Sequence, residues 1–168
     1  MSAPTGSDLA WLLDASIWVR LAVAMLCGIA CGLEREIHHR EAGLRTMMLI
    51  SLGAALYVMI GEMMAKGGGQ DIDPTRIAAQ VVTGVGFLGA GVIIQQGMTV
   101  RGLTTAATIW TMAAIGALVG AGYPLLGFAI TALMVTALVI VSIVERRYFD
   151  HDTRQAVADR KLSADRNQ

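Results

Sequence analysis

The sequence predicts an all-α membrane protein: a polytopic bundle of about five transmembrane helices, N-terminus outside and C-terminus cytoplasmic. Three observations predict this fold class. Hydrophobic residues make up 55% of the 168 residues and charged residues 15%, against about 25% charged residues in soluble domains. Five apolar runs approach the roughly 20 residues that a helix needs to cross a bilayer. The basic residues gather mainly on one side of these runs.

The predicted spans cover residues 16–33, 44–61, 77–94, 103–121 and 124–144. We expect the first span to stay as an uncleaved anchor, because residues 1–16 lack the Lys or Arg of a signal peptide. Its Arg20 is expected to extend to the lipid–water interface. The third span holds Gln80 and four glycines, and fits either a full crossing or a kinked, partly re-entrant helix.

The distribution of basic residues predicts the orientation. Ten of the 13 Lys and Arg residues fall on the side of the first loop, the third loop and the tail. The other three are Arg20, Lys66 and Arg76. Because basic loops stay in the cytoplasm, the C-terminus is predicted to be cytoplasmic, and an odd number of spans then places the N-terminus outside. A formal net charge of zero gives no indication of a nucleic-acid partner.

Small residues predict close helix packing. Residues 84–89 match a GxGxxG pattern, which in a soluble fold can bind a dinucleotide. Here the pattern lies in an apolar run without the acidic residue expected about 20 positions later, so helix packing is favoured. The glycines expected at helix contacts, including a possible contact between two copies of the chain, are Gly28, Gly32, Gly84, Gly86, Gly89, Gly91, Gly116 and Gly120.

Cys27 and Cys31 are four residues apart on one helical face. They could bind a soft metal or respond to oxidation, or they could be small residues at a helix contact. We favour the contact and expect free thiols.

The start of the third span combines a helix cap with polar residues. Asp73 fits an N-cap and Pro74 the first helical position. Arg76 and Gln80 lie four residues apart where this helix enters the membrane, and intramembrane polar groups are functional candidates. We expect an Asp73–Arg76 pair at the outer boundary.

Polar residues at the cytoplasmic ends of the spans could form one functional cluster. The alternative is a set of ordinary solvated flanks. The cytoplasmic candidates are Glu34, Arg35, Glu36, Arg45, Thr46, Arg101, Thr104 and Thr105. The outer candidates are Asp73, Arg76 and Gln80.

The candidate carboxylates suit Mg²⁺, but they are split between the two membrane faces, so no metal is assigned. His38 and His39 could sense pH, and a metal site there is not favoured. Neither a catalytic triad nor a GxxxxGK[ST] phosphate loop occurs in the sequence. We therefore expect neither an enzyme nor a bound cofactor.

Several motifs, in order, resemble the MgtC/SapB family: GLERE (32–36), AGLRT (42–46), DPTRIAAQ (73–80), GVGFLGAG (84–91) and RGLTTAA (101–107). The resemblance implies a bacterial inner-membrane protein with five spans. It agrees with the division that the apolar runs and basic residues predict: a periplasmic segment (1–15), a membrane domain (16–144) and a cytoplasmic tail (145–168). The family's charged positions correspond to Glu34, Arg35, Arg45, Asp73, Arg76 and Arg101. Longer members end in an ACT-like domain, and this sequence resembles a short form without it.

The resemblance also implies a role in adaptation to low magnesium and in acid tolerance. Members look like regulators that bind other membrane proteins, including the F-type ATP synthase and a P-type magnesium transporter. Two hypotheses therefore stand: a membrane regulator, and a small Mg²⁺ or proton transporter that works as an oligomer.

Overall fold

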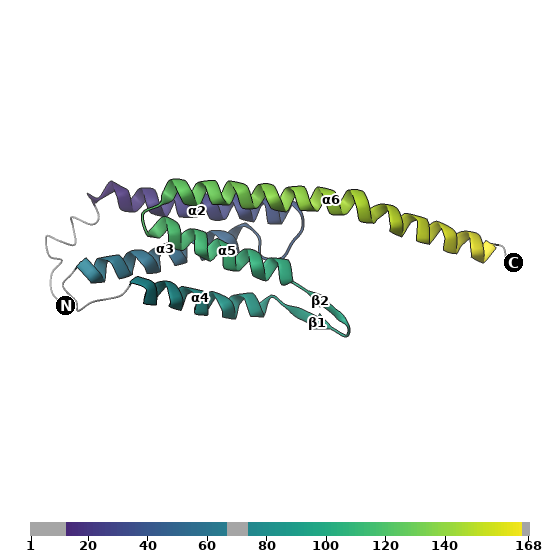
Figure 1. Ribbon diagram of the computed structural model, residues 1–168, viewed down its shortest axis with the longest axis horizontal. Coiled ribbons are helices and arrows are strands. Elements are labelled where there is room, and N and C mark those ends of the chain that lie inside the picture. The colour runs from purple at the N-terminus through teal and green to yellow at the C-terminus, as the bar shows by residue number, and fades with distance from the viewer. Residues whose placement is uncertain (1–12, 67–73, 166–168) are drawn as a thin grey trace. The chain divides into compact units, whose positions relative to one another are not determined.

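The structure is a computed structural model that describes residues 13–66 and 74–165. Within these residues it contains five helices and one hairpin (Figure 1). The helices are α2 (Ala15–Ile37), α3 (Leu44–Lys66), α4 (Pro74–Gly91), α5 (Leu103–Gly120) and α6 (Pro124–Asp165), and the strands are β1 (Ile94–Gln96) and β2 (Thr99–Arg101). The chain divides into two compact units, Met1–Ala132 and Leu133–Gln168, and all contacts discussed below lie in the first.

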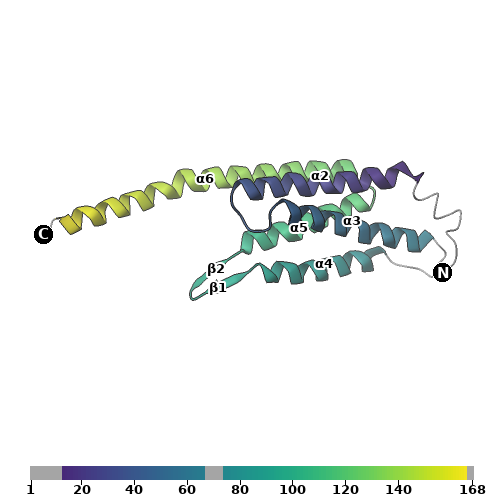
Figure 2. The same ribbon diagram turned by 180° about the vertical axis from the view of Figure 1, so that it is seen from behind.

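Helices α2, α3 and α5 pack together, and α4 lies beside α3 and α5 (Figures 1 and 2). Their shared core contains Ala24, Ala55 and Val119, all fully buried. Large apolar side chains such as Leu26, Leu49 and Trp110 are more than half exposed on the outside of the same helices. A small interior with an apolar exterior is the arrangement expected when lipid surrounds the protein.

Four of the described helices are long and apolar enough to cross a membrane: Ala15–Ile37, Leu44–Ala65, Leu103–Gly120 and Pro124–Glu145. The all-α polytopic bundle is therefore confirmed. Helix α4 is not among the four, since Arg76, Gln80 and its glycines reduce its mean hydropathy. It nevertheless runs antiparallel to α3 and α5 (Figure 1), and its 18 residues extend about 27 Å. The third predicted crossing stays a prediction from the sequence.

The prediction that the third span continues to residue 94 is wrong. Helix α4 ends at Gly91, and the amides of Val92 and Ile93 bond to carbonyls three residues back, which closes the last turn. The chain then forms an antiparallel hairpin in which Ile94 pairs with Arg101 and Gln96 with Thr99. β-branched residues favour the extended strands, and Gly97, at φ +61°, permits the two-residue turn.

The helix boundaries carry recognisable caps. Asp14 Oδ1 accepts a hydrogen bond from the Ser16 amide at 2.9 Å and begins α2. Helix α4 begins at Pro74, as predicted, whereas Asp73 lies outside the described residues. Helix α6 continues without a break through the predicted boundary at residue 144 and ends at Asp165, so most of the predicted tail is helical.

Candidate functional site

The inner face of α2 becomes polar at its C-terminal end. Its buried residues recur three and four positions apart, from Ala24 through Cys27 and Cys31 to Arg35. Cys27 and Cys31 are free thiols inside this contact face, as expected. The same face ends on two charged side chains: Arg35 is 2% exposed and Glu34 is 7% exposed. A buried charge in a membrane bundle is costly, so both residues are candidates for a functional role.

Arg35 is held by a residue from α5. Its Nη2 donates a hydrogen bond of 2.7 Å to Oγ1 of Thr105, which is also buried. Thr105 is placed there by the hairpin, because α5 begins directly after Gly102. Gly102 adopts φ +87°, and a Cβ at this position would collide with the Val92 carbonyl. The turn that joins the hairpin to α5 thus needs glycine to set the position of Thr105.

Glu34 is only partly paired. Its Oε1 lies 3.2 Å from Nδ1 of His38, one helical turn further on. That Nδ1 also lies 2.9 Å from the Glu34 backbone carbonyl, so an N–H at Nδ1 can serve two acceptors. Glu34 Oε2 and Arg35 Nε are buried and have no hydrogen-bond partner among the described residues. The carboxylate oxygen can therefore still accept, and the guanidinium N–H can still donate, a hydrogen bond to a water molecule or another polar group.

The loop between α2 and α3 encloses a second polar feature, which we call the arginine hollow. It has a volume of about 580 Å³ and is lined by Leu33, Glu36, Arg40, Gly43, Leu44, Arg45 and Thr46. Glu36 Oε2 accepts a hydrogen bond from the Leu44 amide at 3.2 Å, which fixes the loop to the start of α3. The hollow brings Glu36, Arg45 and Thr46 of the predicted cluster together.

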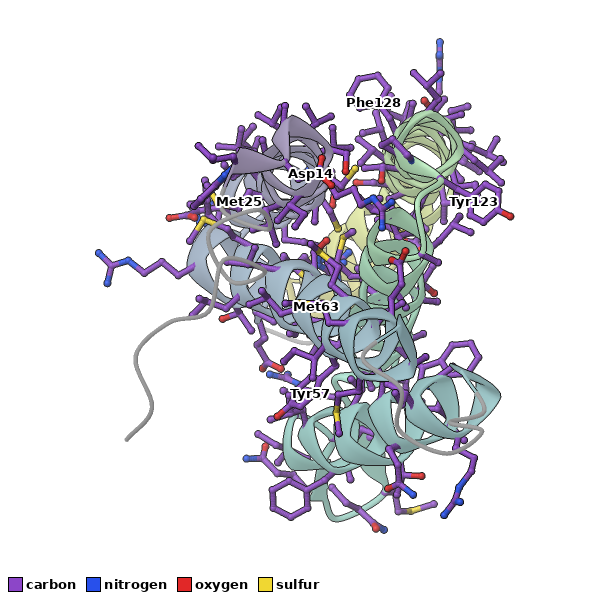
Figure 3. All side chains as sticks on the ribbon, turned by 90° about the vertical axis from the view of Figure 1, so that its left-hand side faces the viewer. Asp14, Met25, Tyr57, Met63, Tyr123 and Phe128 are labelled. Carbon is purple, nitrogen blue, oxygen red and sulfur yellow. The ribbon has the colours of Figure 1, made fainter. Side chains whose placement is uncertain are left out.

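Helices α3 and α4 enclose a larger apolar hollow, which we call the α3–α4 groove, with a volume of about 790 Å³. Its lining includes Gln80, and Thr46 lies at the end nearest the arginine hollow. Figure 3 shows Tyr57 of α3 on the side that faces α4. The intramembrane amide of Gln80 thus borders this groove and not the charge cluster.

The predicted single cytoplasmic cluster does not form. Glu34, Arg35 and Thr105 are buried together, whereas Arg101 and Thr104 are exposed on β2 and the first turn of α5. The physical reason is that consecutive residues of a helix or strand point in different directions, so Thr104 is exposed although Thr105 is buried. At the other end of the bundle Arg76 is exposed, and its predicted partner Asp73 lies outside the described residues.

A second charged contact was not predicted from the sequence. Arg20, which we expect to extend to the lipid–water interface, also has partners within the protein. Its Nη1 donates a hydrogen bond of 2.8 Å to Glu62 Oε2 on α3 and another of 3.1 Å to the Gly120 carbonyl on α5. The negative charge of Glu62 and the carbonyl at the C-terminal end of α5 stabilise the Arg20 guanidinium in this position. The sequence did contain a signal for this contact, because the first two predicted spans are antiparallel and therefore place Arg20 and Glu62 at the same membrane face.

The predicted packing glycines fall into two groups. A Cβ on Gly28 or Gly32 would collide with the α3 backbone at Met47, Met48 or Leu44, and Gly116 and Gly120 lie equally close to α3 at Ser51 and Ala55. Gly89 is near Ala106 of α5. The other three glycines do not pack as expected: no described atom lies within 4 Å of a Cβ built on Gly84, Gly86 or Gly91. Their helix, α4, has more open surface than the sequence suggested.

These features define a class: a polytopic α-helical membrane protein with a closely packed bundle and a buried, partly unpaired charge cluster near one end. The MgtC family model matches residues 21–147, so the chain belongs to the MgtC family. This confirms the resemblance read from the motifs.

Similar proteins agree with the assignment. The protein MgtC of Brucella abortus (strain 2308) is 52% identical over 102 residues, which is 61% of this chain and 41% of that protein. The protein MgtC of Salmonella typhimurium (strain LT2) is 44% identical over 123 residues, or 73% of this chain and 51% of that protein. An uncharacterised Synechocystis protein is 49% identical over 104 residues, 62% of this chain and 43% of that protein. The chain thus spans between 41% and 51% of the length of these curated relatives. No solved structure matches the chain.

Proposed function

We propose that this protein is a non-enzymatic regulator in the bacterial inner membrane, and that it acts on other membrane proteins during adaptation to low magnesium and acid stress. The observation that carries the proposal is the close contact of α2, α3 and α5. Gly28 abuts the backbone of α3 from one side, and Gly116 and Gly120 abut it from another. Family membership supports the physiological setting, and candidate partners are a magnesium transporter and the F-type ATP synthase.

The packing favours a regulator because of where the polar groups lie. The Glu34–Arg35–Thr105 cluster stands at one end of the bundle and the Arg20–Glu62 pair at the other. Between them α3 touches α2 and α5 backbone to backbone, with Cys27, Met47, Ala55 and Met112 filling the interior. Among the described residues, an ion moving through this interior would lose its hydration and meet only a few buried hydroxyl groups, such as that of Ser51, which is strongly unfavourable in a low-dielectric medium.

The outer surface of α4 suits contacts with other membrane proteins. Phe87 is 82% exposed, and the neighbouring Gly86 leaves the helix backbone accessible. Transmembrane helices associate where small residues let backbones approach closely. A partner helix is therefore expected to contact α4 on this face.

Cross-linking in living cells tests the proposal. A photoreactive amino acid replaces Phe87 in one strain and the fully buried Met112 in a control strain, and both are irradiated after growth in low or high magnesium. We expect the Phe87 position to capture a defined membrane protein in low magnesium, with growth in low magnesium dependent on the chain. Capture of lipid alone by Phe87, together with unimpaired growth of the deletion strain, would contradict the proposal.

A transporter that works as an oligomer is the second candidate. Two observations favour it: Glu34 Oε2, which has no hydrogen-bond partner within residues 13–66 and 74–165, and the Gln80 amide beside the α3–α4 groove. Two or more copies could bring such groups together along a shared path. Ion flux across a sealed bilayer separates this candidate from the regulator.

A further inference from the structure

The arginine hollow and the α3–α4 groove meet at Thr46, which lines both. One is polar and lies at the membrane face where α2 ends and α3 begins. The other is apolar and follows α3 and α4 into the bundle's membrane region. A molecule that filled both would need a polar head joined to an apolar chain.

The groove exists because glycines face it from both helices. No described atom lies within 4 Å of a Cβ built on Gly53 of α3 or Gly84 of α4. Leu49 and Tyr57 on its border are about 60% exposed, so the groove is open at the surface that meets lipid. Its walls carry aliphatic side chains, which suit a hydrocarbon chain.

The length of the groove matches one leaflet of the bilayer. Tyr57 is 11 positions after Thr46 on α3, which corresponds to a rise of about 16 Å. Half of the hydrocarbon core is about 15 Å. Because α4 is antiparallel to α3, Leu88 and Gly84 line this half, whereas Ile77 lies further along, beside Gly61. Gln80 is one turn of α4 from Ile77 toward Gly84, so an acyl chain that runs from Thr46 to Tyr57 ends at about the level of Gln80.

The charge of the hollow selects an anionic head group. Among the residues that line it, Arg40 and Arg45 are basic and Glu36 is acidic, and Glu36 Oε2 accepts a hydrogen bond from the Leu44 amide. The lining residues therefore carry one more positive than negative formal charge. Basic pockets at the membrane face attract the phosphates of anionic lipids.

We propose that this protein binds an anionic phospholipid, with its head-group phosphate at Arg40 and Arg45 and one acyl chain in the α3–α4 groove between Thr46 and Tyr57. The site uses none of the residues of the buried Glu34–Arg35–Thr105 cluster. It is also separate from the exposed Phe87 face of α4, so it does not depend on the proposed regulatory role.

Native mass spectrometry of the purified full chain tests the site. The protein is titrated in detergent with phosphatidylglycerol or with phosphatidylcholine that carries the same acyl chains. We expect retention of phosphatidylglycerol to exceed that of phosphatidylcholine, and each change, Arg40→Gln or Arg45→Gln, to reduce this preference by about fivefold. Arg101→Gln removes an exposed arginine outside the hollow and is expected to leave the preference unchanged.

A second pair of variants tests the acyl chain. Gly84→Leu places a side chain in the groove, and Gly86→Leu places one on α4 outside its lining; both positions have open space, so both variants should fold. Gly84→Leu is expected to lower retention of both lipids at least fivefold, and Gly86→Leu to have no effect. Gln80→Leu replaces the amide near the expected end of the acyl chain with an apolar side chain and is expected to leave lipid retention unchanged.

Glycerol 3-phosphate, which has the head-group chemistry without the chains, separates a lipid site from a free-phosphate site. We expect no displacement of phosphatidylglycerol at equal concentration. The proposal would be overturned if glycerol 3-phosphate bound as well as phosphatidylglycerol. It would also be overturned if Arg40→Gln and Arg45→Gln left the preference for phosphatidylglycerol unchanged, or if Gly84→Leu left lipid retention unchanged. Loss of retention in Gln80→Leu would overturn it as well, because it would indicate an occupant that needs the amide, such as a partner helix.

Discussion

Arg35 is the residue on which the buried cluster depends, because it is the one side chain shown to join α2 to Thr105 of α5. Glu34 next to it is buried with one oxygen unpartnered among the described residues. Removal of the arginine would leave the carboxylate without a neighbouring positive charge and the Thr105 hydroxyl without its donor. Charges buried together are much more costly when separated than when paired.

Arg35→Ala is therefore expected to lower the free energy of unfolding by about 3 kcal/mol or more. Arg101→Ala, at an exposed position of the hairpin, should change it by less than about 0.5 kcal/mol. Unfolding in mixed detergent micelles, followed by circular dichroism, measures both. Equal stability of the two variants would show that the buried contact with Thr105 contributes nothing.

The Arg20–Glu62 pair is expected to be coupled. Both side chains are partly exposed, at 22% and 34%, so the contact is weaker than a fully buried one. A double-mutant cycle with Arg20→Met and Glu62→Leu should give a coupling energy of about 1 kcal/mol. Additive single effects would mean that the ion pair does not stabilise the fold.

The sequence identified Glu34, Arg35 and Thr105 as polar candidates but could not separate them from Arg101 and Thr104. All lie at the ends of the predicted spans, and burial depends on how each helix is rotated. A shift of one position decides whether Thr104 or Thr105 faces Arg35. The pairing of Arg20 was also missed, because an arginine near a span end can either extend to water or find a partner.

At the scale of the elements, glycine decides which helices touch. Gly116 of α5 lies against the backbone of Ser51 on α3, whereas Gly86 of α4 faces open space. Both belong to the small-residue patterns that the sequence shows. Only the packing distinguishes a glycine needed for contact from one that is merely tolerated.

Gly116→Ala is accordingly expected to cost about 1–3 kcal/mol, since the added methyl group must move α5 away from α3. Gly86→Ala serves as the matched control and should be neutral or stabilise by up to about 1 kcal/mol. Thermal unfolding of the two variants in detergent measures the difference. A stable Gly116→Ala protein would contradict the close contact of α3 and α5.

Apolar run lengths predicted the helices well, because lipid forces the backbone of each crossing to satisfy its own hydrogen bonds. The hairpin of residues 94–101 was missed because its apolar residues extend the third run. The signal for a turn was Gly97, which lies between the β-branched pairs Ile93–Ile94 and Thr99–Val100.

At the scale of the molecule, charge asymmetry predicts that the α2–α3 loop faces the cytoplasm and the α5–α6 turn faces outward. Exposed Glu41 and Tyr123 lie in these two connections. In a background where Cys27 and Cys31 are replaced by alanine, Tyr123→Cys should react with an impermeant maleimide in intact cells. Glu41→Cys should react only after permeabilisation, and the reverse pattern would contradict the orientation.

The central claim is that the contact of α2, α3 and α5 closes the bundle to ions. The most direct measurement is ion flux. The purified protein is placed in sealed liposomes that contain magnesium-sensitive and pH-sensitive dyes, and a gradient and a potential are imposed. The variants Asp73→Asn and Glu34→Gln are measured in the same way. We predict that Mg²⁺ and proton flux will equal that of empty liposomes for all three proteins. Flux above empty liposomes that either substitution abolishes in well-folded protein would contradict the account and identify a transporter.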